Sequence, residues 1–242
     1  MIKPDRREIL SRVASGTLSP EDAAAQLDAI DAGERQPQSS IRTVRVIRQL
    51  GSAEIVGDPS VRDAVAEGQH HARIEGDVMV FEGWNTDVPG GFVFGFGRNL
   101  ASGAVVVRMN PELGLDVQVQ AGDCHVRGVQ GPIRAKVQAG SATIDGFISP
   151  VDLTVQAGDL QATGRLDRGD SRVGCKAGSV RLHLERGSSV RIKARSALGD
   201  VELPGRGTRL GVAGTEEYVI GDGAGSLAIE TTMGSVKVTT EA

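Results

Sequence analysis

The feature that most constrains this chain is a short phrase that occurs five times between Val117 and Leu203. The copies read VQVQAGDCHV, AKVQAGSATI, LTVQAGDLQA, VGCKAGSVRL and ARSALGDVEL, and they align on Gly122, Gly140, Gly158, Gly178 and Gly199. Two further copies, VIRQLGSAEI at Gly51 and IETTMGSVKV at Gly234, extend the phrase toward both ends. A spacing of 18 to 21 residues is typical of proteins built from stacked coils. The chain is therefore expected to be a repeat protein.

Each copy carries the pattern of short strands. Counted from the glycine, positions −5, −3, −1, +2 and +4 are apolar or small and alternate with polar residues, as in half-buried strands. The alternation shifts by one at the Gly-Asp or Gly-Ser step, as it does at a corner or bulge. Another strand is expected between copies, as in Gly131–Ala135. One such coil cannot bury its own apolar face, so the sequence predicts a mainly β fold, a β-solenoid over residues 41–242.

Stacking the coils in chain order, at roughly 4.8 Å per rung, predicts which residues lie over one another. The column expected to line the core is Val119, Val137, Val155, Cys175 and Ser196. A second column is expected to form an amide ladder on an outer face: Gln120, Gln138, Gln156 and Lys176. Arg48 stands where most copies are apolar, which indicates a terminal coil with one open side. Cys124 and Cys175 fall too many rungs apart for a disulfide, so both are expected in the core.

Residues 1–32 predict a two-helix hairpin, followed by a polar linker over residues 33–40. Apolar stripes that include Leu10 and Leu27 mark the two helices, and Ser19 followed by Pro20 resembles a helix start. Such a hairpin must bury its stripes on something. It either packs on its own chain or on another copy, or it docks a partner through residues such as Leu10 and Leu27.

Most of the aromatic residues lie in a Gly/Phe-rich insertion around residues 81–98. Phe92, Phe94 and Phe96 alternate, so one strand face would present three rings, with Trp84 nearby. The rings either seal one end or flank of the solenoid or contact a partner, another copy or a membrane surface, because exposed apolar clusters rarely persist without a use. The candidate partner-binding residues here are Trp84, Phe92, Phe94 and Phe96.

The sequence predicts no catalytic residue, no cofactor and no metal site. Asp123 and Asp159 share the position after the glycine, but two rungs would separate them by roughly 10 Å, beyond a retaining glycosidase pair and at the edge of an inverting one. Aspartate and serine both suit a turn after glycine, which favours a structural role. His70 and His71 are adjacent and would point to opposite faces of a strand.

Charge and hydropathy restrict the partners and the location. A net charge of −4 gives no general attraction to nucleic acid. Nine basic residues lie between Arg165 and Arg195 against three acidic ones, and stacking would gather several on one flank. That flank is either a solvated face that protects sheet edges or a site for an anionic partner. No signal peptide or long apolar run is evident, so a cytoplasmic location is expected, with peripheral membrane association left open.

The segments EILSRVASGTLSPEDAAAQLDAI, VQAGDCHVRGVQGPIRAKVQAGSATIDGF and YVIGDGAGSLAIETTMGSVKV resemble the bacterial putative-adhesin, or toast-rack, β-strand-repeat family. With its predicted N-terminal helical hairpin, the chain resembles the members of the LiaX and YvlB type. The resemblance spans nearly the whole chain. It implies a role near cell-envelope stress responses, with the solenoid as a sensing or docking surface, and it supplies no catalytic residues.

The leading hypothesis is a non-enzymatic interaction or scaffold protein that contacts its partners through the hairpin and the Phe-rich segment. A protein partner or self-association is expected, and a membrane-associated regulator is one candidate. The first alternative is a self-assembling, filament-like solenoid. The second is a carbohydrate-active enzyme that uses the face carrying Asp123 and Asp159.

Overall fold

The computed structural model describes Ser15, Ser19, Ala23 and residues 41–83, 104–205 and 214–241. The chain divides into two compact units, Met1–Ser40 and Ile41–Ala242, and each is considered by itself. In the first unit the Ala23 amide donates a hydrogen bond to the Ser19 carbonyl at 2.9 Å. The remainder of the predicted hairpin lies outside the described residues. So do the candidate contact residues Leu10, Leu27, Trp84, Phe92, Phe94 and Phe96.

The described part of the second unit is mainly β, as predicted, and consists of two sheets. Sheet A contains β1 (Thr43–Leu50), β4 (His70–Glu75), β5 (Val78–Gly83), β7 (Gly114–Ala121), β9 (Ile133–Ala139), β11 (Val151–Ala157), β13 (Asp170–Ala177), β15 (Val190–Leu198), β17 (Gly214–Ile220) and β18 (Gly225–Met233). Sheet B contains β2 (Ala53–Gly57), β3 (Ala64–Glu67), β6 (Val105–Met109), β8 (Cys124–Arg127), β10 (Ala142–Phe147), β12 (Leu160–Gly164), β14 (Val180–Leu184), β16 (Val201–Glu202) and β19 (Val236–Thr240).

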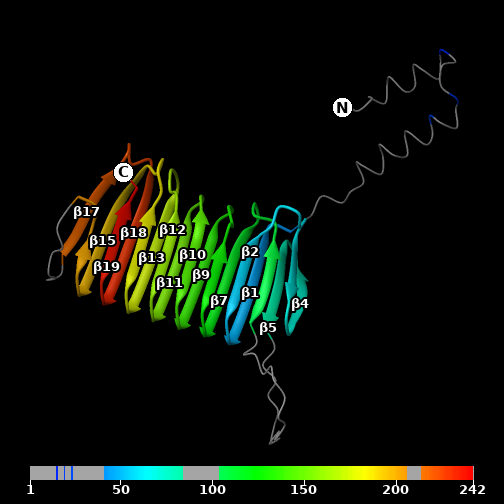
Figure 1. Ribbon diagram of the computed structural model, residues 1–242, viewed down its shortest axis with the longest axis horizontal. Helices are drawn as coiled ribbons and strands as arrows, with labels where there is room; N and C mark the ends of the chain where they lie inside the picture. The colour runs from blue at the N-terminus through cyan, green and yellow to red at the C-terminus, as the bar shows by residue number, and fades with distance from the viewer. Residues whose placement is uncertain are drawn as a thin grey trace, which may run out of the picture. The chain divides into compact units, whose positions relative to one another are not determined.

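Each glycine-centred phrase forms one strand of sheet A and the following strand of sheet B. The interior pairings are parallel, as between β9 and β11 or between β10 and β12. Antiparallel pairings occur where β4 joins β5, β3 joins β6 and β17 joins β15. Figure 1 shows the strands of the second unit lying side by side. Together the two sheets enclose one core.

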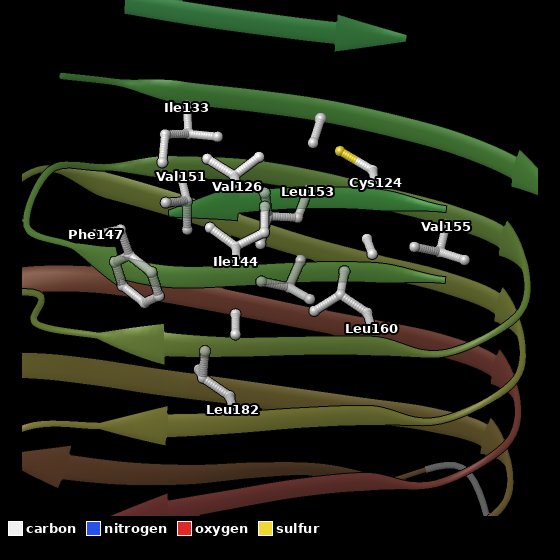
Figure 2. Packing of buried hydrophobic residues seen from close by; sticks show 14 of the residues in the cluster. Cys124, Val126, Ile133, Ile144, Phe147, Val151, Leu153, Val155, Leu160 and Leu182 are labelled. Carbon is white, nitrogen blue, oxygen red and sulfur yellow. The ribbon is translucent and has the colours of Figure 1, made fainter. Parts of the chain in front are cut away.

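The core lies between the sheets and is filled by every second residue of each strand. Val119, Val137, Val155 and Cys175 stack in register and are buried, as the repeat predicts. Figure 2 shows aliphatic side chains and the ring of Phe147 packed between the two layers. Both cysteines are buried and free, also as predicted. Burial raises the pKa of the Cys124 thiol to about 12, so this thiol stays protonated at neutral pH.

The order of coils in the stack differs from the order along the chain, and here the prediction was wrong. Cys175 is followed in its column by Thr231 of β18, and Ser196 lies on the far side of Thr231. The C-terminal coil, β18 and β19, is thus inserted between β13–β14 and β15–β16, as Figure 1 shows for β18. Stacking in chain order would have placed Arg172 beside Lys193, and the inserted Ala228 separates these like charges.

The N-terminal coil is inserted in the same way. β1 lies between β5 and β7, and β2 lies between β6 and β8. The prediction that Arg48 marks an open-sided terminal coil is therefore wrong. The Arg48 side chain is buried beside Gly83, where a Cβ atom would approach its guanidinium to 2.0 Å. Burial lowers the pKa of Arg48, because desolvation disfavours the charged form.

The corner glycines lie directly on one another's backbone. Gly140 has φ +132°, and a Cβ atom placed there would come within 2.1 Å of the Gly122 carbonyl oxygen. At Gly234 the Cβ would approach the Gly178 carbonyl oxygen to 1.7 Å, and at Gly199 it would approach that of Gly234 to 1.9 Å. These contacts follow the inserted order, and a side chain is excluded at six corners of the repeat: Gly122, Gly140, Gly158, Gly178, Gly199 and Gly234.

Replacing one corner glycine should destabilise the whole stack. Gly140→Ala adds both a backbone clash and an unfavourable φ, so the free energy of unfolding should fall by roughly 3 kcal/mol. Gly76→Ala is the matched control, because Gly76 has φ +63° and nothing within 4 Å of its added Cβ; it should cost about 1 kcal/mol. Urea unfolding measures both, and equal losses would contradict the corner contact.

The inserted coil can be tested with engineered disulfides. Arg172→Cys with Ala228→Cys joins in-register residues of β13 and β18, whereas Arg172→Cys with Lys193→Cys joins residues two strands apart. Adjacent strands place paired Cα atoms roughly 5 Å apart and alternate strands roughly 10 Å apart, and only the shorter span suits a disulfide. The first pair should crosslink within the chain on mild oxidation. Crosslinking of the second pair instead would indicate stacking in chain order.

Candidate functional site

Asp123 and Asp159, the two aspartates considered for glycan chemistry, accept hydrogen bonds from the neighbouring coils. Asp123 Oδ1 accepts a hydrogen bond from the Ser141 backbone amide at 2.9 Å, and Asp159 Oδ1 accepts one from the Ser179 amide at 3.0 Å. The Ser179 hydroxyl also donates to Asp159. That hydroxyl bond, followed by the amide bond, holds the pKa of Asp159 below its ordinary value. Each carboxylate thus bonds to the next coil, in the structural role that the Gly-Asp turn favours.

The histidines of β4 do not form a metal site with their neighbours. His70 Nδ1 lies 2.9 Å from the Gly68 carbonyl, and its ring meets the Phe81 ring edge-on with centroids 5.5 Å apart. His71 is the register partner of Glu82. Within the described ranges, no group of three or more His, Cys, Asp or Glu side chains is arranged to hold a metal ion. Nor does any helix in those ranges have the length and apolarity needed to cross a membrane.

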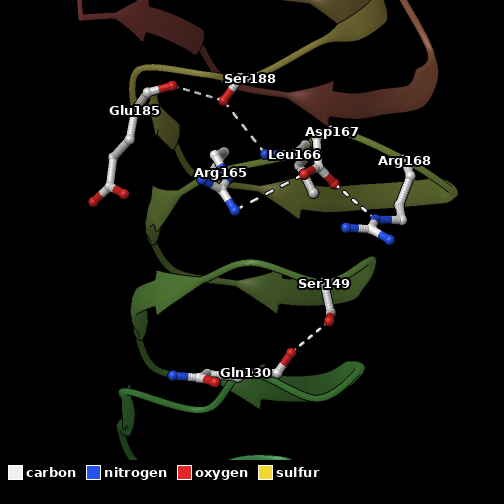
Figure 3. Close-up of polar contacts among 8 residues, drawn as sticks. All are labelled: Gln130, Ser149, Arg165, Leu166, Asp167, Arg168, Glu185 and Ser188. Atoms are coloured by element: carbon white, nitrogen blue, oxygen red, sulfur yellow. Dashed lines mark hydrogen bonds and ion pairs between the residues drawn. The ribbon is translucent and has the colours of Figure 1, made fainter.

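The nine basic residues between Arg165 and Arg195 divide among three places. Five gather on the outer face of sheet A, as stacking predicts: Arg172, Lys176, Arg191, Lys193 and Arg195. Arg181 lies on the outer face of sheet B, and Arg165, Arg168 and Arg186 lie in the turns that follow β12 and β14. Figure 3 shows Asp167 between Arg165 at 3.9 Å and Arg168 at 3.0 Å. The positive charge of these two turn arginines is therefore met by one acid.

An alternating charge ladder crosses the outer face of sheet A. Its members follow one another in register: Arg45, Asp116, Arg134, Asp152 and Arg172. Arg45 Nε lies 2.9 Å from Asp116 Oδ2, and Arg134 Nε lies 3.5 Å from Asp152 Oδ2. Sequence analysis missed this ladder, although every member stands six residues before a corner glycine. Its first four members line a hollow of about 620 Å³, but they already form the ion pairs Arg45–Asp116 and Arg134–Asp152.

The residues just before the corner glycines form an apolar line of exposed and half-buried side chains, which we call the apolar seam. In stack order it consists of Leu50, Ala121, Ala139, Ala157, Ala177, Met233 and Leu198. The pattern predicted that position −1 faces the core, and this was wrong. Strands such as β9 and β11 end with two exposed residues in succession, so position −1 points outward. Leu50 is 56% exposed, Met233 53% and Leu198 65%.

The two ends of sheet A are antiparallel strands that carry ion pairs. On β4, Arg73 contacts both Glu75 and Glu82 at 2.6 Å. On β17, Glu217 lies 3.2 Å from Lys193 Nζ. In sheet B, β16 at one end has only two residues. Charged or very short edge strands discourage the addition of another chain, which weakens the filament alternative.

The chain was compared with known proteins. No protein-family model matches it, and no curated protein matches it. Among solved structures it is similar to one described as a "putative cell adhesion protein" from Clostridium sporogenes, with a TM-score of 0.42 and 11% identity, over 84% of this chain and 94% of that one. The score is too low for any property of that protein to be transferred to this chain.

The Asp159 bond makes a testable contribution to stability. Because its pKa is lowered in the folded state, Asp159 stabilises the fold at pH values above the unfolded pKa of about 3.9, and this stabilisation is lost as the pH falls through the folded pKa. Asp159→Asn should therefore have a lower urea midpoint at pH 7 than the unmodified chain. On acidification below pH ~4, the midpoint of the variant should fall by less than that of the unmodified chain.

Asp200→Asn is the matched control. Asp200 occupies the same position after Gly199, but within the described residues its carboxylate accepts no hydrogen bond from a neighbouring coil, and only its backbone carbonyl does. Its substitution removes no bond between coils, so it should lower the urea midpoint at pH 7 by less than Asp159→Asn does. Equal midpoints for the two variants would contradict the role of Asp159.

Proposed function

We propose that this chain is a non-enzymatic interaction protein, a β-solenoid scaffold on which a protein partner docks along the apolar seam. The supporting observation is the exposure of Leu50, Met233 and Leu198 on a single line that runs across the stack. Six rung spacings make this line roughly 29 Å long. Exposed apolar surface of this kind marks interaction sites more often than it persists without a use.

The surroundings of the seam suit a partner segment with an apolar stripe and polar flanks. The middle of the seam is alanine, which allows close approach, and bulkier side chains stand toward its two ends. Beside it, Gln120, Gln138 and Gln156 line a hollow of about 130 Å³ together with Lys136 and Thr154. An apolar centre with a polar rim is the usual anatomy of a protein interface. An amphipathic helix of about 19 residues would match the length of the seam.

Two parts of the proposal rest on the sequence. The role in cell-envelope stress comes from the family resemblance. Additional contacts through Leu10, Leu27, Trp84, Phe92, Phe94 and Phe96 come from the apolar and aromatic patterns. The carbohydrate-active alternative is less well supported, because Asp123 and Asp159 are engaged by the next coil.

The seam can be tested with a photocrosslinking residue at Ala157, at its middle. In cells that express the full chain, Ala157 should form an adduct with a partner, and Leu50→Ser, Met233→Ser and Leu198→Ser together should reduce its yield at least about tenfold, because each loses the burial of a large apolar side chain. Val65→Ser, Ile74→Ser and Val219→Ser are the matched control, since these residues are also exposed but lie off the seam.

The control triple variant should keep the adduct, and both variants should keep the urea midpoint within the range of surface substitutions. Equal losses of adduct in the two variants would exclude the seam as the docking line. An adduct of twice the chain mass would show that the seam binds a second copy of the chain and not a different protein.

A further inference from the structure

A donor-rich hollow lies on the outer face of sheet B, away from the seam. It has a volume of about 190 Å³ and is formed by neighbouring strands β12, β14 and β19. Its polar lining consists of Gln161, Thr163, Arg181, His183, Lys237 and Thr239. No aspartate or glutamate is among the described residues that line it.

The register places these six side chains in a grid. Gln161, Arg181 and Lys237 follow one another across the three strands, and Thr163, His183 and Thr239 form the row beside them. Arg181 and Lys237 are thus two cations in direct register on adjacent strands, an arrangement that is unfavourable in isolation. In the charge ladder on sheet A, by contrast, each cation lies in register with an acid.

The insertion of the C-terminal coil produces this pair of cations. In chain order Arg181 would lie beside Glu202 of β16, but Lys237 of β19 stands between them. Lys237 Nζ forms an ion pair with the Glu202 carboxylate, 2.9 Å from Oε2 and 3.0 Å from Oε1. The hydrogen bonds from the Ser179 hydroxyl and amide, and after them the charge of Arg181, hold the pKa of Asp159 below its ordinary value, so the Asp159 carboxylate is engaged by Ser179. Among the described acids, none lies within ion-pair distance of the Arg181 guanidinium.

The other polar groups that face the hollow come from the row of Thr163, His183 and Thr239. His183 Nδ1 lies 2.9 Å from the Thr239 hydroxyl, which leaves Nε2 as the outer nitrogen, 4.0 Å from a Glu241 oxygen. Glu241 also lies 3.7 Å from Arg186, so its charge is shared. The Thr163 hydroxyl completes the row beside Arg181.

We propose that this hollow binds a phosphate group. The Arg181 guanidinium would hold two of its oxygens in the bidentate geometry that suits phosphate. Lys237, which also holds Glu202, would add an N–H donor, and the Thr163 hydroxyl would donate to a remaining oxygen. A bound phosphate places a negative charge beside the two in-register cations and relieves their repulsion. Free phosphate and a phosphate ester on a lipid headgroup present the same oxygens to this hollow.

The test is calorimetric titration of the full chain with inorganic phosphate at about 0.15 M salt, where long-range attraction is screened. Arg181→Gln should weaken binding at least about tenfold, the loss expected when a charge-assisted contact is removed. Arg191→Gln is the matched control, because Arg191 is exposed in β15 on the other sheet. It should bind phosphate like the unmodified chain, and all three proteins should share one urea midpoint.

The result that would overturn the site is absence of saturable phosphate binding, or equal weakening by Arg181→Gln and Arg191→Gln. Sedimentation with phosphatidylglycerol vesicles then identifies the source. Vesicle binding that needs Arg181 and is absent from phosphatidylcholine vesicles assigns the site to a lipid headgroup. Phosphate binding without vesicle binding assigns it to a soluble phosphate.

Discussion

The contact on which the rest of the structure depends is that of each corner glycine with the backbone carbonyl of the glycine beneath it. A Cβ atom at Gly158 would lie 2.0 Å from the Gly140 carbonyl oxygen, so the coils can approach at strand spacing only if no side chain is present. This contact also sets the register of every coil. Once the glycines are aligned, core residues, charge ladder, Asp–Ser bonds and apolar seam fall into columns.

Much of the fold could be predicted from the sequence, because the pattern that specifies strands and corners is local. The alternation of apolar and polar residues identifies the strands, and the glycine identifies the corner, so the burial of Val119, Val137, Val155 and Cys175 followed directly. The charge ladder was equally accessible, since Arg45 and Asp116 stand at the same distance before Gly51 and Gly122. It escaped notice because an alignment by hydrophobicity treats outward positions as equivalent.

The order of the coils could not be predicted in this way. All coils share one pattern, so any of them can stack on any other with the glycines aligned. The sequence of one coil therefore does not determine which coil lies next to it. The contacts between coils do differ with the order, but not in one direction: insertion separates Arg172 from Lys193 by Ala228 and also places Lys237 beside Arg181. The orientation of position −1 was missed for another reason. Strict alternation fails where the strand bends into the corner, so Leu198 is exposed where alternation would bury it.

In a stack of nearly identical coils, a binding site requires positions at which the residues differ from the repeated pattern. The inserted coil β18–β19 creates two such departures. It places Met233 beside Leu198, which gives the apolar seam its bulkiest stretch, and it places Lys237 between Arg181 and Glu202, which assembles the phosphate hollow. In chain order Leu198 would adjoin Ala177 and Arg181 would adjoin Glu202, so the seam would be flatter and the cation neutralised. The placement of the C-terminal coil therefore determines both surfaces at once.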